Sequence, residues 1–298
     1  MSRSPRGLTG VLRRALPDAL NARISKRLKA RLRALLGIEP WPDLAVRRPL
    51  FRTAEYRALR EAARVFDVEK PNKPVLERGH QVSYVVAKWF RDAGVRSAVH
   101  VGFANGRYLF YLSRLGIACG GVDLPPERTA WVNVPGGVFD EAVMRRLLRR
   151  DFFDLALGEL DAVWGAGTAV DVLFSEATFE TLLPWREGGA SVPGYLAMDP
   201  GALRALMHER FPVKLAELGR SVRNMIFIEP EPEAGGAGAV FEACAALLGG
   251  FEHGVWDFRP PLDSLFRLSP RYPTRQCIYA FTTDPALLIA LGTYAVKR

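Results

Sequence analysis

The sequence predicts an α/β protein in which helices cover both faces of a mainly parallel sheet. From Ser97 onward, short runs of apolar and β-branched residues alternate with helical segments, which is the pattern of successive β-α units. These runs are too apolar to leave one face of a sheet in water, so the sheet must be covered on both sides. Helical patterns at about Thr53–Phe66 and Glu77–Ala93 add N-terminal helices before the first strand.

The predicted elements follow from the period of the apolar residues. Strands have short apolar runs, and we expect them at Ser97–Val101, Ala118–Asp123, Val170–Phe174, Asn224–Glu229, Glu252–Phe258 and Gln276–Thr282. Helices have apolar residues three or four apart, and we expect them at Gly106–Leu115, Asp140–Arg149, Pro200–Phe211 and Ala239–Leu248. A parallel sheet of this kind needs one more strand, which we expect inside residues 150–168.

The first 50 residues differ from the rest in charge. Residues 1–38 hold ten Lys and Arg against one acid, Asp18, which accounts for the whole formal charge of +9. Leucines at mostly four-residue spacing predict one or two amphipathic helices broken near Pro17. The proline-rich stretch 38–49 is typical of a linker. The sequence therefore predicts an arm and linker at 1–50 and one domain at 51–298.

The arm has several possible partners. Its leucine row and arginines suit the surface of an anionic membrane, and the same row suits docking on a protein. Nucleic acid is the weaker alternative, because phosphates offer the leucines no apolar surface. An organellar transit peptide would share the Arg-rich, acid-poor composition.

Composition excludes several classes of protein. With 49% apolar residues the chain is not intrinsically disordered, and its apolar runs are too short to cross a bilayer. Three widely separated cysteines give neither a disulfide framework nor a close-spaced zinc motif, so we expect no metal. The expectation is a cytoplasmic protein, peripheral to a membrane if the arm binds lipid.

The chemistry centres on the turn after the first strand. Residues Gly102-Phe103-Ala104-Asn105-Gly106 join that strand to a helix, and glycines there allow a ligand to approach the backbone. The next strand ends at Asp123, 21 positions after Gly102, which suits a carboxylate that accepts hydrogen bonds from two ribose hydroxyls. Together they predict a nucleoside site at the carboxyl end of the sheet.

These motifs resemble those of class I S-adenosylmethionine-dependent methyltransferases, which have a Rossmann-like fold. The resemblance covers roughly residues 75–285, with some similarity to sugar O-methyltransferases. It implies S-adenosylmethionine as cofactor and a C-terminal antiparallel hairpin ending in RQCIYAFTT. It implies cofactor contacts by residues of the turn and of the strand ends: His100, Gly102, Ala104, Gly106, Asp123 and Ser175.

Two residues depart from the family's acidic-x-Gly-x-Gly-x-Gly pattern. His100 stands where the acid is usual, and Ala104 stands in place of the middle glycine. An alanine costs little at negative φ and is strained at positive φ, so the conformation of Ala104 decides its effect.

A dinucleotide fold is a weaker alternative. Its fingerprint is Gly-x-Gly-x-x-Gly, whereas this turn has glycines only at its first and fifth positions, and the phosphate-loop lysine is absent.

Methyl transfer to a hydroxyl calls for a general base. The candidates are Glu176, His208, His253 and Glu229. The segment VDVLFSEATFETL resembles the family's fourth strand, and this resemblance implies that Glu176 lies at a strand end facing the site. His80 and Tyr84 share a helix face before the first strand, where related folds close the donor pocket; for Tyr84, core packing is the competing role.

The leading hypothesis is an S-adenosylmethionine-dependent methyltransferase that O-methylates a small molecule, glycan or lipid-linked acceptor. One alternative is a catalytically inactive scaffold or interaction protein with the same fold, which the departures at His100 and Ala104 suggest. The other is an RNA methyltransferase that grips phosphates with the arm.

Overall fold

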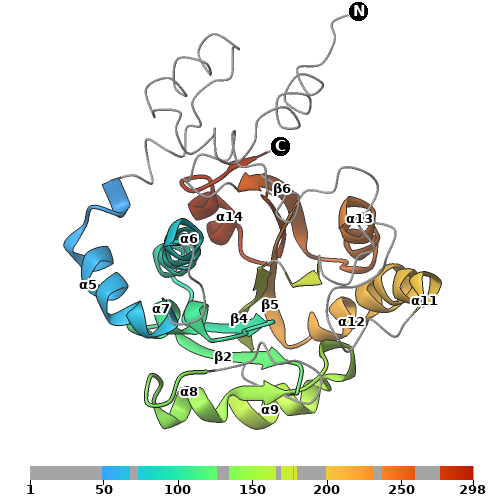
Figure 1. Cartoon of the computed structure of the whole chain (residues 1–298). Coiled ribbons are helices and arrows are strands. Elements are labelled where there is room, and N and C mark those ends of the chain that lie inside the picture. Colours follow the sequence, from blue (N-terminus) through green and yellow to red (C-terminus); the bar gives the residue numbers. More distant parts are fainter. Residues whose placement is uncertain are drawn as a thin grey trace, which may run out of the picture.

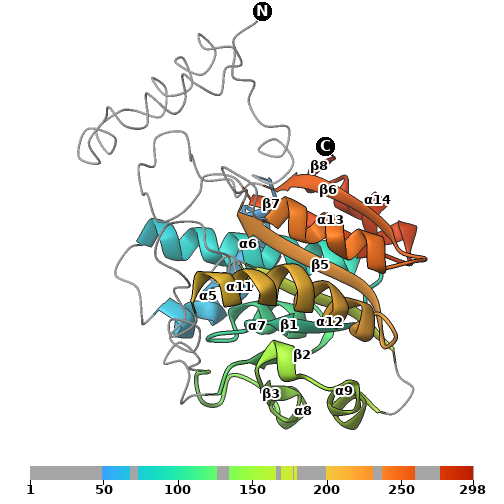
Figure 2. The same cartoon turned by 90° about the vertical axis from the view of Figure 1, so that its right-hand side faces the viewer.

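The computed structural model of this chain describes residues 49–67, 73–125, 134–165, 169–176, 178–179, 199–230, 237–258 and 276–297. The predicted basic arm at 1–38 and nearly all of the linker lie outside these ranges. Within them, an eight-stranded sheet has helices on both faces (Figures 1 and 2). No helix of this described part is both long and apolar enough to cross a membrane.

Five strands of the sheet run parallel. They are β1 (Ser97–Val101), β2 (Ala118–Asp123), β3 (Leu147–Arg149), β4 (Val170–Glu176) and β5 (Val222–Pro230). Three strands from the end of the chain complete the sheet, namely β6 (Glu252–Phe258), β7 (Gln276–Thr282) and β8 (Val296–Lys297). The spatial order is β3-β2-β1-β4-β5-β7-β6-β8.

Strand β7 lies between β5 and β6 and is antiparallel to both. A mainly parallel sheet that ends in this hairpin, behind N-terminal helices, confirms the predicted Rossmann-like methyltransferase fold. The chain adds β2 and β3 on one side of β1 and then places β4 on the other side, so the strand order reverses between β1 and β4. In open α/β sheets, ligands bind outside the carboxyl ends of the strands at such a switch point.

The N-terminal helices cover one face of the sheet. They are α5 (Ala54–Ala62), a 3-10 helix at Ala63–Asp67, and α6 (Lys73–Asp92), which is followed by β1. Thr53 begins α5 because its Oγ1 accepts a hydrogen bond from the Tyr56 backbone N–H at 3.1 Å.

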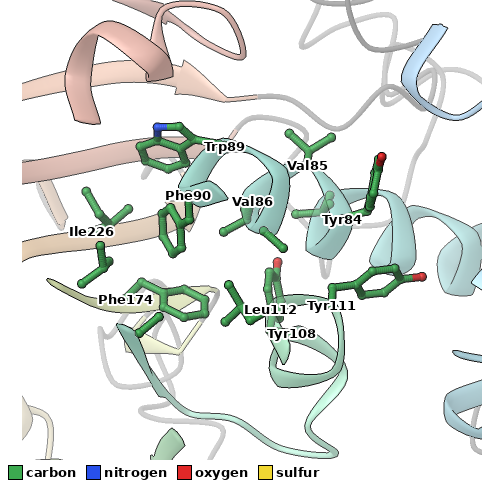
Figure 3. Packing of buried hydrophobic residues seen from close by; sticks show 14 of the residues in the cluster. Tyr84, Val85, Val86, Trp89, Phe90, Tyr108, Tyr111, Leu112, Phe174 and Ile226 are labelled. Carbon is green, nitrogen blue, oxygen red and sulfur yellow. The ribbon is translucent and has the colours of Figure 1, made fainter. Parts of the chain in front are cut away.

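Helix α6 buries a row of large side chains at helical spacing. Phe90 points toward Phe174 and Ile226 of the sheet, with Val86 beside it (Figure 3). The Trp89 indole N–H donates instead to the Leu287 carbonyl oxygen at 3.0 Å. Helices α7 (Arg107–Arg114) and α14 (Pro285–Leu291) belong to the same apolar cluster. This cluster fixes α6 beside the start of α7, next to the predicted turn.

The other face is covered by the chain between β4 and β6. A helix runs from α11 (Pro200–Ala205) through a π-helical turn at Leu206–Arg210 into α12 (Phe211–Leu218), beside α13 (Ala237–Leu247). The sequence predicts an end at Phe211, before Pro212. The helix continues because the missing N–H of Pro212 falls in the first turn of α12, after the wider π turn.

The prediction for the third strand was wrong. The expected helix Asp140–Arg149 is only a short helix, α8 (Glu141–Arg145), followed by β3, whereas residues 150–165 form a 3-10 helix and α9 (Leu157–Trp164). Strand β3 pairs with β2 through Gly121↔Leu147 and Asp123↔Arg149. A three-residue strand shows no periodicity, and backbone pairing with β2 decides it.

Candidate functional site

The turn after β1 requires glycine at both ends. Gly102 has φ +75° and Gly106 has φ +83°, in the left-handed region that favours glycine. A Cβ on Gly102 would also overlap the side chain of Thr178, which follows β4. The Thr178 hydroxyl donates to the Val101 carbonyl oxygen at 3.1 Å, so the chain after β4 is held against the end of β1.

Ala104 is strained. Its φ is +47°, and it is the one non-glycine residue with positive φ in the part of the chain that the structure describes. Position 104 therefore has the positive φ at which alanine is strained and glycine is favoured. Its N–H donates to Asp123 Oδ2 at 2.7 Å, which gives the strained peptide a charged partner.

Asp123 faces this turn from the end of β2. Its second oxygen, Oδ1, accepts the Leu124 N–H at 2.8 Å. Burial raises the pKa of Asp123, although the two backbone N–H donors and the Arg149 charge oppose that effect. A carboxylate has about four lone-pair sites, and the two N–H groups use two of them. Asp123 therefore keeps acceptor capacity for hydroxyl groups of a ligand.

Arg149 was missed because the sequence did not locate β3. It lies beside Asp123 in the β2–β3 register, and its guanidinium carbon sits 4.7 Å from the centroid of the Phe103 ring. Phe103 is buried, and its ring packs where Gly121 has no side chain. The sequence feature that could have indicated β3 is the apolar pair Leu147–Leu148 directly before the charged Arg149.

His100 lies on the face of β1 that packs against the N-terminal helices. Its ring stacks on Phe174 with centroids 4.4 Å apart and planes 5° apart, and Tyr108 packs edge-on at 4.8 Å. Neither ring nitrogen has a hydrogen-bond partner among the described residues. Burial, and secondly the Arg107 charge, lowers the pKa of His100 to about 3, so the imidazole is neutral.

Ser175 is held by another strand. Its hydroxyl donates to Glu229 Oε1 at 2.9 Å, and the same oxygen accepts the Phe179 N–H at 3.3 Å. Ser175 and Glu229 are both fully buried, so they tie the end of β4 to the end of β5. The structure therefore assigns a partner to the hydroxyl that the family resemblance gave to the cofactor.

Glu176 lies at the same edge of the sheet as Asp123. The register pairs Val101 with Ser175, which puts Glu176 level with Gly102, and its side chain is half-buried. The predicted base Glu176 and the predicted cofactor residues Gly102 and Asp123 are thus brought together.

The structure does not bring His208 or His253 to this edge. His253 pairs with Phe281, which pairs with Met225 near the start of β5, so it lies toward the amino ends of the parallel strands. His208 is exposed on the π turn, whose buried residues are Leu206 and Met207.

The face of α6 that carries His80 and Tyr84 makes several polar contacts. His80 Nε2 lies 2.8 Å from Asp67 Oδ1, and Nδ1 lies 3.0 Å from the Tyr111 hydroxyl. Burial lowers the pKa of His80 to about 4, so the contact with Asp67 is a hydrogen bond from a neutral ring. The Tyr84 ring is buried, and its hydroxyl donates to Glu55 Oε1 at 2.6 Å.

The chain is similar, at low sequence identity, to several solved structures. No family model and no curated protein matches the chain. Among solved structures, magnesium protoporphyrin IX methyltransferase from Synechocystis with bound SAM is 13% identical, with a TM-score of 0.41 over 82% of this chain and 98% of that chain. The O-methyltransferase TomG from Streptomyces achromogenes in complex with SAM is 13% identical, with a TM-score of 0.42 over 76% and 90%. The chain has the Rossmann-like fold of class I methyltransferases, as its own strand order shows.

Proposed function

We propose that this chain is an S-adenosylmethionine-dependent methyltransferase whose donor lies across the carboxyl ends of β1 and β2. The observation that carries the proposal is the Asp123 carboxylate, which is mostly buried, turned toward the Gly102–Gly106 turn and bonded to the Ala104 N–H. A half-buried carboxylate with free lone pairs, at the carboxyl end of β2 and next to β1, suits the two hydroxyls of a ribose.

The protein's own residues would hold and orient the donor. Asp123 would accept from the ribose hydroxyls, and the turn would offer its backbone to the adenosyl group. When bound, S-adenosylmethionine supplies a methyl group already activated by the sulfonium charge. The protein then has mainly to place an acceptor atom in line with that methyl group.

Glu176 is the proposed general base for a hydroxyl of a small molecule, glycan or lipid-linked acceptor. It is half-buried at the carboxyl end of β4, on the same edge of the sheet as Asp123, whereas His80 and His100 are buried and neutral. A carboxylate level with Gly102 can take a hydroxyl proton as the methyl group leaves the donor. The segments 180–198 and 259–275, which follow β4 and β6, lie outside the described residues.

Calorimetric titration with S-adenosylmethionine and S-adenosylhomocysteine tests the proposal. We expect saturable binding by the wild type and at least about tenfold weaker binding by Asp123→Ala, because a charge-assisted pair of hydrogen bonds is lost. Asp154→Ala is the matched control, since Asp154 is exposed near the end of β3, and its affinity should equal that of the wild type. No heat of binding at millimolar ligand would remove the proposal.

An inactive scaffold is favoured by one observation, the strained Ala104 in place of glycine. Donor binding without methyl transfer to any acceptor in a small-molecule, glycan and RNA panel would support this second function. The RNA methyltransferase alternative depends on the arm, which lies outside the described residues; it predicts RNA binding that weakens steeply with salt and disappears on deletion of residues 1–38.

A further inference from the structure

Arg149 lies beside Asp123 on the same face of the sheet. It ends β3, and the parallel register of β2 and β3 pairs it with Asp123, so the two side chains point to the same side of strands that lie about 4.8 Å apart. The Arg150 N–H donates to the Asp123 carbonyl oxygen at 2.9 Å, which continues this pairing past the end of β3. The sheet itself therefore places Arg149 next to the carboxylate that would bind the ribose.

The Arg149 guanidinium is held on the ring of Phe103. Its central carbon lies 4.7 Å from the ring centroid, within the range of a cation–π contact. Phe103 is buried, and a Cβ on Gly121 would lie only 2.5 Å from its ring, so close packing fixes the ring in place. The turn after β1 thus supports Arg149 through Phe103 and also donates the Ala104 N–H to Asp123.

Arg149 does not close on the carboxylate. Among the described residues its side chain forms no ion pair, and its Nη1 atom is buried without a hydrogen-bond partner. A direct pair with Asp123 would give Nη1 a partner, but it would also occupy the carboxylate oxygens that the ribose hydroxyls need. The stack on Phe103 keeps the positive charge near the carboxylate and leaves those oxygens open.

The other ionisable groups around Asp123 are engaged elsewhere or neutral. The turn Gly102–Gly106 has no ionisable side chain, and the buried His100 ring on β1 is neutral. Three arginines of neighbouring elements have partners of their own: Arg146 on the Trp164 ring, Arg150 on Glu159 and Arg107 on Ser83. Burial raises the pKa of Asp123, and Arg149 is the charged side chain that opposes this rise within the described part of the chain.

We propose that Arg149 is a positioning residue, which keeps Asp123 ionised and open to the ribose of the donor, with the Phe103 ring as its support. The proposal rests on the proposed function and deepens it by giving the end of β3 a part in donor binding. Arg149 acts through the carboxylate. Loss of its charge should therefore weaken binding most at the acid end of the pH range, where the carboxylate takes up a proton.

Calorimetric titration with S-adenosylhomocysteine at pH 8 and pH 5.5 measures this role as a ratio of two affinities. We expect the ratio of the affinity at pH 8 to that at pH 5.5 to be at least about threefold larger in Arg149→Met than in the wild type. Because the ligand titrates alike with every variant, the difference belongs to the protein. Circular dichroism at both pH values checks that each variant is folded.

Two further variants separate charge from shape. Arg149→Lys keeps the positive charge and should restore the wild-type ratio. Arg150→Met is the matched control, since it removes a positive charge from the next residue, whose side chain is 58% exposed, and it should also keep the wild-type ratio. Combined with Asp123→Asn, Arg149→Met should leave the ratio unchanged, because no carboxylate remains to titrate.

A merely structural Arg149 gives a different result. Binding that Arg149→Met weakens equally at both pH values, or does not weaken at either, would overturn the positioning role. A larger ratio that persists in the Asp123→Asn background would overturn it as well, because the effect would then belong to another group. The proposed function stands in each of these cases, whereas a wild type that binds no S-adenosylhomocysteine would overturn both proposals.

Discussion

Ala104 donates its backbone N–H to the Asp123 carboxylate across 19 positions of sequence, at 2.7 Å. This bond joins the turn after β1 to the end of β2, and it is made by the residue whose φ of +47° is strained. The geometry of the turn and the orientation of the carboxylate therefore depend on each other.

Replacing Ala104 with glycine should stabilise the protein. A left-handed conformation costs an L-residue about 1–2 kcal/mol, and the substitution removes this strain. The greater freedom of glycine in the unfolded chain offsets about 0.5–1 kcal/mol of the stabilisation. We expect Ala104→Gly to raise the free energy of unfolding by about 0.5–1 kcal/mol in urea. Ala118→Gly, at an exposed position that begins β2, should lower it by a similar amount. A less stable Ala104→Gly would contradict the strain.

The affinity for S-adenosylhomocysteine should depend on the protonation of Asp123. Because burial raises the pKa of this carboxyl group, it takes up a proton at higher pH than an ordinary aspartate and then binds hydroxyls less well. Affinity should therefore fall as the pH is lowered toward that raised pKa, starting above the usual aspartate range. Asp123→Asn should bind about tenfold more weakly at pH 7 and show a flat profile over the same range. A wild-type profile as flat as that of Asp123→Asn would contradict this role.

The buried neutral histidines should make the fold sensitive to acid. His80 has a pKa lowered from 6.5 to about 4, so between these values the unfolded chain binds more protons than the folded one. Stability from this group is complete above pH 6.5 and is lost as the pH falls toward 4, by roughly 3 kcal/mol from the size of the shift. His100 acts in the same direction.

Guanidinium unfolding at pH 7, 6 and 5 measures this slope. His80→Gln should flatten it, at some loss of stability at pH 7, because glutamine cannot bridge Asp67 and Tyr111 as the ring does. His253→Gln, at an exposed position, should keep the wild-type slope. Equal slopes in all three proteins would show that His80 does not carry the effect.

Ser175 should matter for stability more than for the donor. Ser175→Ala removes a hydrogen bond to the buried Glu229 carboxylate and should cost about 1–3 kcal/mol. Donor affinity should stay within about twofold, because the hydroxyl is already used by the protein. Ser113→Ala, on a half-buried helix position, should change stability by less than about 0.5 kcal/mol. A large loss of donor affinity with unchanged stability would restore Ser175 to the cofactor.

Most of the strands could be predicted from the sequence, because apolar runs with turn residues between them are local features. Local features also indicated the turn at Gly102–Gly106, where a strand is followed by small residues. They indicated Asp123 as well, because a carboxylate there ends the next strand. Strand β3 could not be found, since three residues at a sheet edge have no period to detect.

The sequence by itself determined which residues form four of the five parallel strands, and where a carboxylate that binds a nucleoside could stand, because both depend on neighbours along the chain. Only the tertiary structure decided that His253 lies toward the amino ends of the strands, that Ser175 faces Glu229, and that Arg107 rests on Gly79. Strand direction, the face of a pleat and the approach of two helices are set by partners distant in sequence, which no local pattern records.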